Sequence, residues 1–294
     1  CSSDLISNEV SIALVIVFFN PSLEDIEHAK ALAIKWDGVI VDNSVNPCIG
    51  EELIGKMQYI PLRGNRGIAE AQNIGINAVM SKWAPTHVVF LDQDSRASVS
   101  YPEEIVNNFL RIKKAYSSLC CLGPTVINKT TGEEYKSVIH TYASTNDGFS
   151  LRTHIISSGC CVETTAFEIV GFMDSRMFID YVDYEWCWRA NAKGLGCGLT
   201  NNVTLVHKVG KRELSLGSYK VIISSPNRYF YQYRNFIWLI RKKYVPLQWK
   251  FSTGVKFFFR LLYFPLLVRE GVSCWINMIN GIKSGFNKSD KVHK

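Results

Sequence analysis

The chain has 294 residues, of which 47% are hydrophobic and 20% are charged, and it contains no low-complexity tract. These values exclude a disordered or fibrous protein and are typical of one large domain, or of one domain with an extension. Its nine cysteines include the adjacent pairs Cys120–Cys121 and Cys160–Cys161 and no CxxC motif. This usage argues against a disulfide framework or a zinc site and favours reduced, buried thiols in a cytoplasmic protein.

The net charge of +7 is concentrated at one end of the chain. Residues 226–294 contain 13 Lys or Arg against two acidic residues, whereas the preceding 225 residues contain 20 basic and 24 acidic ones. The same C-terminal stretch holds 16 of the 36 aromatic residues. Such a stretch is typical of contact with a membrane surface or with nucleic acid. Because the rest of the chain is acidic and shows no nucleic-acid-binding motif, we expect no nucleic-acid partner.

Apolar runs and helical patterns alternate along the first half of the chain. We expect helices at 22–35 and 68–82, and strands at 11–19, 38–42, 57–62 and 86–91. Ser22 followed by Glu24 and Asp25 is a helix-start pattern. The alternation predicts an α/β fold with a mostly parallel sheet. Ligands of such sheets bind at the carboxyl ends of the strands, where this chain places Asn20, Asp42, Asn65 and Asp92.

In the second half we expect a helix at 103–116, a strand at 121–127 and a polar hairpin at 128–134. A further strand is expected at 154–162, interrupted by Ser157-Ser158-Gly159, and is followed by a short helix at 163–170 that Gly171 ends. A helix then begins near residue 183 and runs to Gly194, and a strand at 203–206 precedes His207.

Three groups of polar residues carry candidate chemistry. Asp92 and Asp94 follow a buried strand and can share one hard divalent cation, Mg²⁺ or Mn²⁺, although Asp-rich turns are also common for backbone reasons. The Asn65-Arg66-Gly67 loop opens a helix, whose free N–H groups favour a bound anion. Asp180, Asp183 and Glu185 crowd together before Arg189, and crowded carboxylates can supply a base or a metal ligand. The alternative for this last group is a capping carboxylate with a Glu185–Arg189 surface ion pair.

The chain carries the following motifs in order: Phe19-Asn20-Pro21, Val41-Asp42-Asn43-Ser44, Asn65-Arg66-Gly67 with Asn73, Asp92-x-Asp94, Ser158-Gly159 and Asp183-Tyr184-Glu185 with Arg189. Their order and composition resemble those of the inverting nucleotide-sugar glycosyltransferases of glycosyltransferase family 2. The resemblance implies a GT-A domain over residues 10–215 and a basic, aromatic helical extension over 216–294. The amino-acid sequence of residues 178–186 and 225–235 is similar to that of bacterial rhamnosyltransferases of the family, which use dTDP-L-rhamnose to build O-antigen or related polysaccharide.

The resemblance also implies roles for individual residues. Donor binding falls to Asn20, Asp42, Asn65, Arg66, Gly67, Asn73, Asp92, Ser158 and Gly159, with Asp42 on the nucleoside and the last two close to the donor sugar. Metal binding falls to Asp92, Asp94 and His207, although a lone His is more often structural than a ligand. Asp183 is expected as the base, beside Glu185 and Arg189. Asp180 remains a candidate base, because Val182 stands where most members have an acidic residue.

Three residues are assigned to the acceptor or to phosphate. Arg228 and Arg234 would neutralise a diphosphate, and Trp186 would stack on an acceptor sugar. The alternatives are a solvated basic helix face for the two arginines and a place in the core for the tryptophan.

Residues 249–268 are apolar but interrupted by four residues, Lys250, Lys256, Arg260 and Pro265. The charge-free stretches between them are too short to span a membrane. Val255, Phe258, Phe259 and Leu262 share a helical face with Lys256 and Arg260 beside it, which suits an interfacial helix whose cations meet anionic lipid. A helix packed on the domain or on a second subunit is the alternative. A saccharide acceptor carried on a polyprenyl diphosphate would place the enzyme peripherally on the cytoplasmic face of the inner membrane.

Three other functions stay open at this point. The first is transfer of a hexose or N-acetylhexosamine from a UDP-sugar on the same fold. The second is a non-enzymatic protein that binds nucleic acid or membrane through its basic end, and the third is a chain that has lost catalysis.

Overall fold

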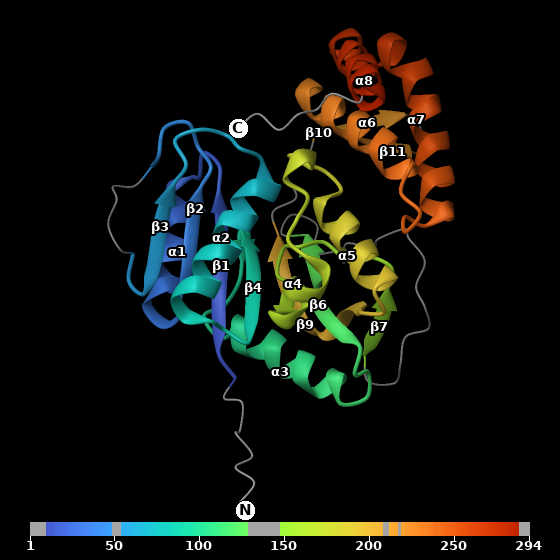
Figure 1. The fold of residues 1–294 in the computed structure, drawn as a ribbon. Coiled ribbons are helices and arrows are strands. Elements are labelled where there is room, and N and C mark those ends of the chain that lie inside the picture. The colour runs from blue at the N-terminus through green and yellow to red at the C-terminus, as the bar shows by residue number, and fades with distance from the viewer. Residues whose placement is uncertain (1–9, 49–53, 129–147, 208–211, 217–218, 288–294) are drawn as a thin grey trace, which may run out of the picture.

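The computed structural model describes residues 10–48, 54–128, 148–207, 212–216 and 219–287 (Figure 1). The side chains of residues 128 and 207–222 lie outside this description, as does most of the hairpin expected at 128–134. Within the described residues, nine strands form one sheet in the order β3-β2-β1-β4-β8-β6-β9-β5, with β7 paired to β9. Their bounds are β1 Ile12–Phe18, β2 Gly38–Asp42, β3 Met57–Pro61, β4 His87–Asp92, β5 Ser95–Arg96, β6 Leu119–Asn128, β7 Phe149–Arg152, β8 Cys161–Glu163 and β9 Gly196–His207.

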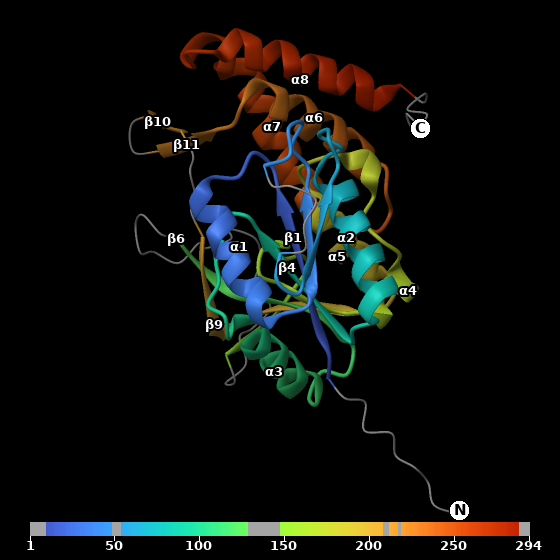
Figure 2. The ribbon, with the colours of Figure 1, turned by 90° about the vertical axis from the view of Figure 1, so that its left-hand side faces the viewer.

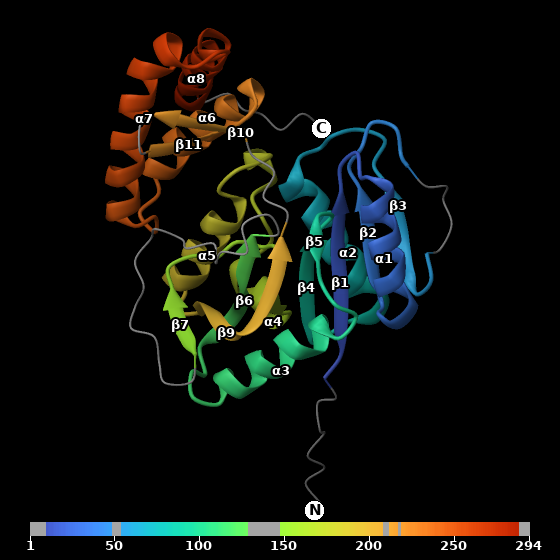
Figure 3. The ribbon, with the colours of Figure 1, turned by 180° about the vertical axis from the view of Figure 1, so that it is seen from behind.

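The first half of the sheet is parallel, as predicted. β1 pairs in parallel with both β2 and β4, and β3 continues the parallel order beyond β2. The second half is mixed, because β8 lies antiparallel between β4 and β6, while β6 and β9 run parallel side by side (Figure 3). The α/β architecture is therefore confirmed.

Helices cover both faces of the sheet. The side chains of Leu14, Ile16 and Phe18 pack with α1 (Leu23–Lys35) and α3 (Tyr101–Lys113) on one face. Alternate residues of β1, from Ala13 to Val17, pack on the other face with α2 (Ile68–Trp83), α4 (Thr165–Val170) and α5 (Val182–Ala192). Figure 2 shows α1 and α2 on opposite sides of the strands. This division follows from the two-residue period of a strand that is buried on both faces.

The strand expected at 154–162 is wrong. β8 begins only at Cys161, and residues 153–160 form a loop. Gly159 has a φ of 76°, and the Ser157 N–H donates to the side chain of Asp183 rather than to a neighbouring strand. The apolar pattern of the run is satisfied by core packing of Ile155 and Cys160 and does not require a sheet ladder.

After β9 the chain forms a hairpin, β10 (Arg212–Leu216) and β11 (Tyr219–Ile223), and three helices, α6 (Pro226–Ile240), α7 (Leu247–Leu267) and α8 (Gly271–Phe286), so the boundary expected between residues 215 and 216 falls within β10. The helices lie together beyond the end of the sheet toward which β1 points (Figure 1). α6 and α8 pack closely, since a Cβ added at Gly281 would lie 2.3 Å from the carbonyl oxygen of Phe230. None of the helices in the described residues is long and apolar enough to cross a membrane.

Candidate active site

A cavity of about 500 Å³ lies at the carboxyl ends of β1 and β4. Its volume is in the range of sites for small-molecule substrates. Its walls come from seven separate stretches of the chain, and the charged and amide side chains among them are Asn43, Asn65, Gln72, Asp92, Gln93, Asp180, Asp183 and Arg228. The sequence prediction of one site at this edge of the sheet agrees with this cavity.

Asp183 lies in the first turn of α5 and lines the cavity. One carboxylate oxygen accepts a hydrogen bond from the backbone N–H of Tyr184 at 2.9 Å and the other from that of Ser157 at 3.2 Å. Burial raises the pKa of Asp183 to about 7, with a smaller contribution from the negative charge of Asp92, although the backbone hydrogen bonds oppose the shift. A carboxylate with a pKa near 7 can accept a proton from a substrate hydroxyl at neutral pH.

Asp180 lines the same cavity but is paired. Both of its oxygens accept hydrogen bonds from the Arg228 guanidinium, from Nε at 2.9 and 3.0 Å and from Nη2 at 2.8 Å. Charge-assisted bidentate pairs are strong, so both oxygens of Asp180 are engaged by Arg228. The two carboxylates therefore differ in environment, and the geometry favours Asp183 over Asp180 as the base.

Asp92 ends β4 and Asp94 lies in the turn before β5, and Asp92 lines the cavity. β5 pairs with the end of β9 through Ser95 and His207, so the backbone of His207 lies beside this loop, whereas its side chain lies outside the described residues. Within the described residues, no group of three His, Cys, Asp or Glu side chains could hold a metal ion. Two carboxylates beside an open cavity fit a hard cation that takes its other ligands from water and substrate oxygens.

The loop before α2 does not offer the free N–H groups that were expected. The N–H groups of Arg66 and Gly67 donate to the side-chain oxygens of Asn43 and Asn65, at 2.7 and 3.0 Å. The N–H of Ile68 donates to the carbonyl oxygen of Phe178 at 2.7 Å. Asn65 and Gly67 line the cavity, but the anion site predicted from open N–H groups is wrong, because other parts of the chain already occupy them.

Asp42 and Asn20, both predicted at the donor site, bind the loop that follows β2. Asp42 has no exposed surface, and its oxygens accept hydrogen bonds from Ser44 N, Cys48 N and the Tyr59 hydroxyl, the last at 2.5 Å. Burial opposes ionisation, yet these hydrogen bonds hold the pKa of Asp42 below its usual range. Asp42 therefore organises the 44–48 loop, and contact with a nucleoside would require this loop to move. Asn20 is exposed with a φ of 49°, and its N–H donates to Ser44, so it shapes the same loop.

The Ser158-Gly159 pair does not face the cavity. Ser158 is buried, with its hydroxyl 2.7 Å from that of Ser95. A Cβ at Gly159 would lie 2.6 Å from both Leu205 and the Tyr101 hydroxyl, so glycine is required by core packing rather than by a donor sugar. The residue that does line the cavity is Ser157, which sequence reasoning missed and which only its position beside the pair could have suggested.

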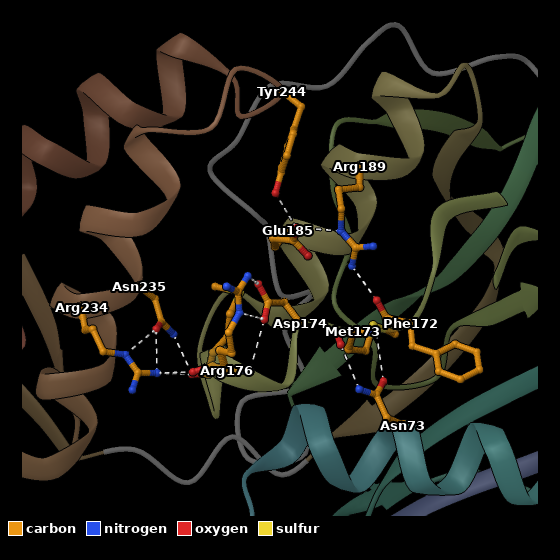
Figure 4. Close-up of polar contacts among 11 residues, drawn as sticks. Asn73, Phe172, Met173, Asp174, Arg176, Glu185, Arg189, Arg234, Asn235 and Tyr244 are labelled. Atoms are coloured by element: carbon orange, nitrogen blue, oxygen red, sulfur yellow. Dashed lines mark hydrogen bonds and ion pairs between the residues drawn. The ribbon is translucent and has the colours of Figure 1, made fainter. Parts of the chain in front are cut away.

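Other predicted site residues are structural (Figure 4). The side-chain amide of Asn73 donates to Met173 O and accepts from Met173 N, both at 2.9 Å, and so ties α2 to that segment. Glu185 is buried, and its Oε1 accepts from Arg189 at 2.7 Å and from the Tyr244 hydroxyl at 2.6 Å. Arg189 also donates to the carbonyl oxygens of Val170 and Phe172, both at 2.7 Å. The Glu185–Arg189 pair is confirmed, and both side chains bind neighbouring parts of the chain rather than line the cavity.

Trp186 and Arg234 also serve the scaffold. Trp186 is 2% exposed and its indole N–H donates to Gly171 O at 2.8 Å, which excludes stacking on an acceptor sugar. Arg234 donates to the carbonyl oxygens of Arg176 and Met177 at 2.7 and 3.0 Å, so its guanidinium is engaged by backbone rather than by phosphate. Of the three residues assigned to acceptor or phosphate, only Arg228 lines the cavity.

Gln93 and Asn43 are further cavity residues that sequence reasoning missed. The Gln93 side chain accepts from Phe19 N at 2.6 Å and donates to Phe19 O at 3.3 Å, so it joins the loops after β1 and β4. Asn43 holds the loop before α2 through Arg66 and Asn65. Both stand inside motifs that had been noted for neighbouring residues.

Comparison with known proteins gives one strong match. No family model matches the chain. It is 34% identical over 255 residues to dTDP-rhamnosyl transferase RfbF of Shigella flexneri, an alignment that covers 81% of this chain and 82% of the relative. It is 21% identical over 237 residues to the low-salt glycan biosynthesis hexosyltransferase Agl10 of Haloferax volcanii, with 74% of each chain covered.

Solved structures agree on the fold. S. aureus TarS in complex with UDP-GlcNAc superposes with a TM-score of 0.56 at 12% identity, covering 95% of this chain and 82% of that one. GalNAc-T7 with UDP, GalNAc and Mn²⁺ superposes with a TM-score of 0.53 at 15% identity, covering 69% and 44%. Both are GT-A glycosyltransferases. The chain has this fold, and its similarity to a rhamnosyltransferase extends over four fifths of both chains. It therefore belongs to glycosyltransferase family 2 and resembles the bacterial rhamnosyltransferases within it.

Proposed function

We propose that this glycosyltransferase moves L-rhamnose from dTDP-β-L-rhamnose to a hydroxyl of a saccharide acceptor, with inversion and with a divalent cation. The observation that carries the mechanism is Asp183, a cavity carboxylate with a pKa of about 7 near the charge of Asp92. The likeness to a dTDP-rhamnosyl transferase supports the donor. The acceptor we propose is a lipid-linked saccharide used in cell-surface polysaccharide synthesis.

Asp183 would take the proton of the acceptor hydroxyl as its oxygen attacks the anomeric carbon from the face opposite the diphosphate. The new glycosidic bond forms as the bond to the diphosphate oxygen breaks, so a β-L-rhamnosyl donor gives an α-L-rhamnoside. Arg228 would hold the carboxylate of Asp180 in place at the cavity wall. Asp92 and Asp94 would hold Mg²⁺ or Mn²⁺, which neutralises charge on a diphosphate leaving group.

The test compares slow hydrolysis and binding of dTDP-L-rhamnose with those of UDP-glucose, UDP-galactose and UDP-N-acetylglucosamine. Each is measured with Mn²⁺ and with EDTA, on the natural protein and on Asp94→Ala. We expect preference for dTDP-rhamnose that is lost with EDTA and in Asp94→Ala. Preference for a UDP-sugar would refute rhamnose as the donor sugar without affecting the family assignment. Turnover that resists EDTA would refute the proposed dependence on a divalent cation.

We also propose that α7 and α8 lie against the surface of an anionic membrane. Phe258, Phe259 and Leu262 of α7 are 55–59% exposed, and Val272, Trp275 and Ile276 of α8 are 37–59% exposed. A single exposed apolar residue is ordinary, but several on two neighbouring helices support a contact surface. Residues 226–287 carry ten Lys or Arg and one acidic residue, a charge that complements anionic lipid.

Arg260 lies against aromatic rings of the helical bundle. Its guanidinium is 5.3 Å from the ring centre of Tyr229 and 5.5 Å from those of Phe257 and Phe264. It therefore contributes to the packing of α6 against α7 and is not part of the surface that we propose for lipid.

The membrane proposal is tested by cosedimentation with vesicles of neutral or anionic phospholipid. Phe258→Glu with Phe259→Glu should release the protein from anionic vesicles. Leu23→Glu, at an 82% exposed site on α1, is the matched control and should leave binding unchanged. Equal sedimentation of the double variant would refute the surface, and a dimer that the double variant splits would reassign it to a second copy of the chain.

A further inference from the structure

The segment that delivers the cavity carboxylates has an unfavourable backbone. Phe178, Asp180 and Tyr181 have φ values of 64°, 67° and 64°, in the left-handed region that residues other than glycine rarely adopt. Three such residues within four persist only where surrounding contacts impose the conformation. Those contacts come largely from the C-terminal extension.

Asn235 of α6 makes most of them. Its side chain is fully buried, and its amide nitrogen donates to the carbonyl oxygens of Met177, Ile179 and Asp180 at 2.9, 2.8 and 3.1 Å. Its amide oxygen accepts from Nε and Nη2 of Arg234 at 3.2 and 3.0 Å (Figure 4). Both ends of the amide are thus engaged, and its orientation is determined by these partners.

The rest of one α6 face holds the same segment. Arg228 binds the carboxylate of Asp180, Tyr231 stacks on Phe178 with ring centres 4.5 Å apart, and Arg234 donates to the backbone of residues 176 and 177. Residues 228, 231 and 235 are spaced by three and four, so they lie on one side of the helix. On the opposite side of the segment, Ile68 at the start of α2 donates to Phe178 O. The segment is therefore held between α2 and α6.

We propose that Asn235 is a positioning residue for Asp183, so that the C-terminal helices form part of the catalytic centre. The physical link is short, because Tyr181 caps α5 and Asp183 lies in the first turn of that helix. A shift of residues 177–180 would tilt this turn and would move Asp183 away from its hydrogen bond with Ser157. The inference rests on the proposed role of Asp183 as base.

The test is Asn235→Asp, which removes the donor that faces three carbonyl oxygens while keeping the size of the side chain. The matched control is Asn277→Asp on α8, where the amide donates only to Ser273 O, one helical turn back, at 2.9 Å. Both are assayed with whichever nucleotide-sugar the natural protein consumes. We expect kcat to fall about 10²-fold in Asn235→Asp with the donor KM nearly unchanged, since a displaced base costs this order.

The pH profile separates positioning from simple loss of structure. In Asn235→Asp the acidic limb should move to lower pH, because a looser segment lets water reach Asp183 and relieves the burial that raises its pKa. The control should keep the kcat, KM and acidic limb of the natural protein. An unchanged kcat and limb would overturn the proposal, and so would a loss of activity that reflects only a smaller folded fraction.

A second variant keeps the inference falsifiable should Asn235→Asp fail to fold. Arg234→Lys retains the charge but loses the Nη2 group that donates to the carbonyl oxygens of residues 176 and 177, and it is judged by the same kcat and pH criteria. Asp183→Asn distinguishes failure of the base role of Asp183 from failure of the positioning role of Asn235. If that variant keeps the natural acidic limb, the base assignment is wrong, whereas if only the α6 variants behave naturally, the positioning role is wrong.

Discussion

Replacing Asp183 by Asn tests the proposed chemistry and the electrostatics together. The variant keeps the shape of the side chain and one acceptor oxygen but removes the base, so turnover should fall by about 10²–10⁴-fold. In the natural protein a pKa of about 7 makes kcat/KM fall about tenfold from pH 8 to pH 6, because the ionised fraction falls by that factor. The residual activity of Asp183→Asn should lack this acidic limb.

The same substitution should stabilise the protein at high pH. The folded pKa of about 7 lies above the ordinary value of 3.8, so the folded state binds the proton more tightly than the unfolded state. Ionisation of Asp183 therefore lowers the free energy of unfolding. This loss is absent below pH 4 and reaches its full size above pH 7. At about 1.4 kcal/mol per pKa unit the upper bound is about 4 kcal/mol. Asp183→Asn removes this cost, so its advantage in free energy of unfolding should grow between pH 4 and pH 8.

The assays are a pH series of initial rates and a parallel series of urea unfolding curves. Asp180→Asn is the paired variant, since it lines the same cavity but loses its ion pair with Arg228. The reasoning is refuted if Asp183→Asn keeps its turnover and acidic limb while Asp180→Asn loses both. A free-energy difference that does not change with pH would refute the raised pKa.

Three further substitutions probe residues that the structure moves out of the catalytic centre. Gly159→Ala should destabilise the fold by about 1–3 kcal/mol, seen as a lower urea midpoint, because its φ is 76° and the new Cβ would meet Tyr101 and Leu205 at 2.6 Å; an unchanged midpoint would contradict the packing argument. Glu185→Gln should cost about 1–3 kcal/mol of stability through its bonds to Arg189 and Tyr244 while kcat of the folded protein stays near the natural value; a selective loss of kcat would restore the catalytic role. Asn73→Leu should lower stability by a similar amount through the lost bonds to Met173 with donor affinity unchanged, whereas a weaker donor affinity at full stability would return Asn73 to the donor site.

The order of elements could be predicted because it depends on local pattern. Continuous apolar runs with proline or polar ends mark buried strands, and Ser22 caps the first helix as predicted, where Asp25 completes a capping box. Motif order then identified the family. The strand expected at 154–162 failed because burial alone does not distinguish a ladder from a packed loop.

By itself the sequence determined the fold class and predicted the edge of the sheet at which the cavity lies and two carboxylates as candidate bases, since these depend on strand order and residue type. Only the tertiary structure distinguished the surroundings of Asp183 from those of Asp180, because Arg228, which pairs with Asp180, lies 48 residues away from it in the chain and reaches the cavity from α6. The tertiary structure also placed Asn73, Glu185 and Arg189 in the scaffold, since the same polar side chain can bind substrate or its own backbone. Which of these it does is set by the neighbours that folding brings to it.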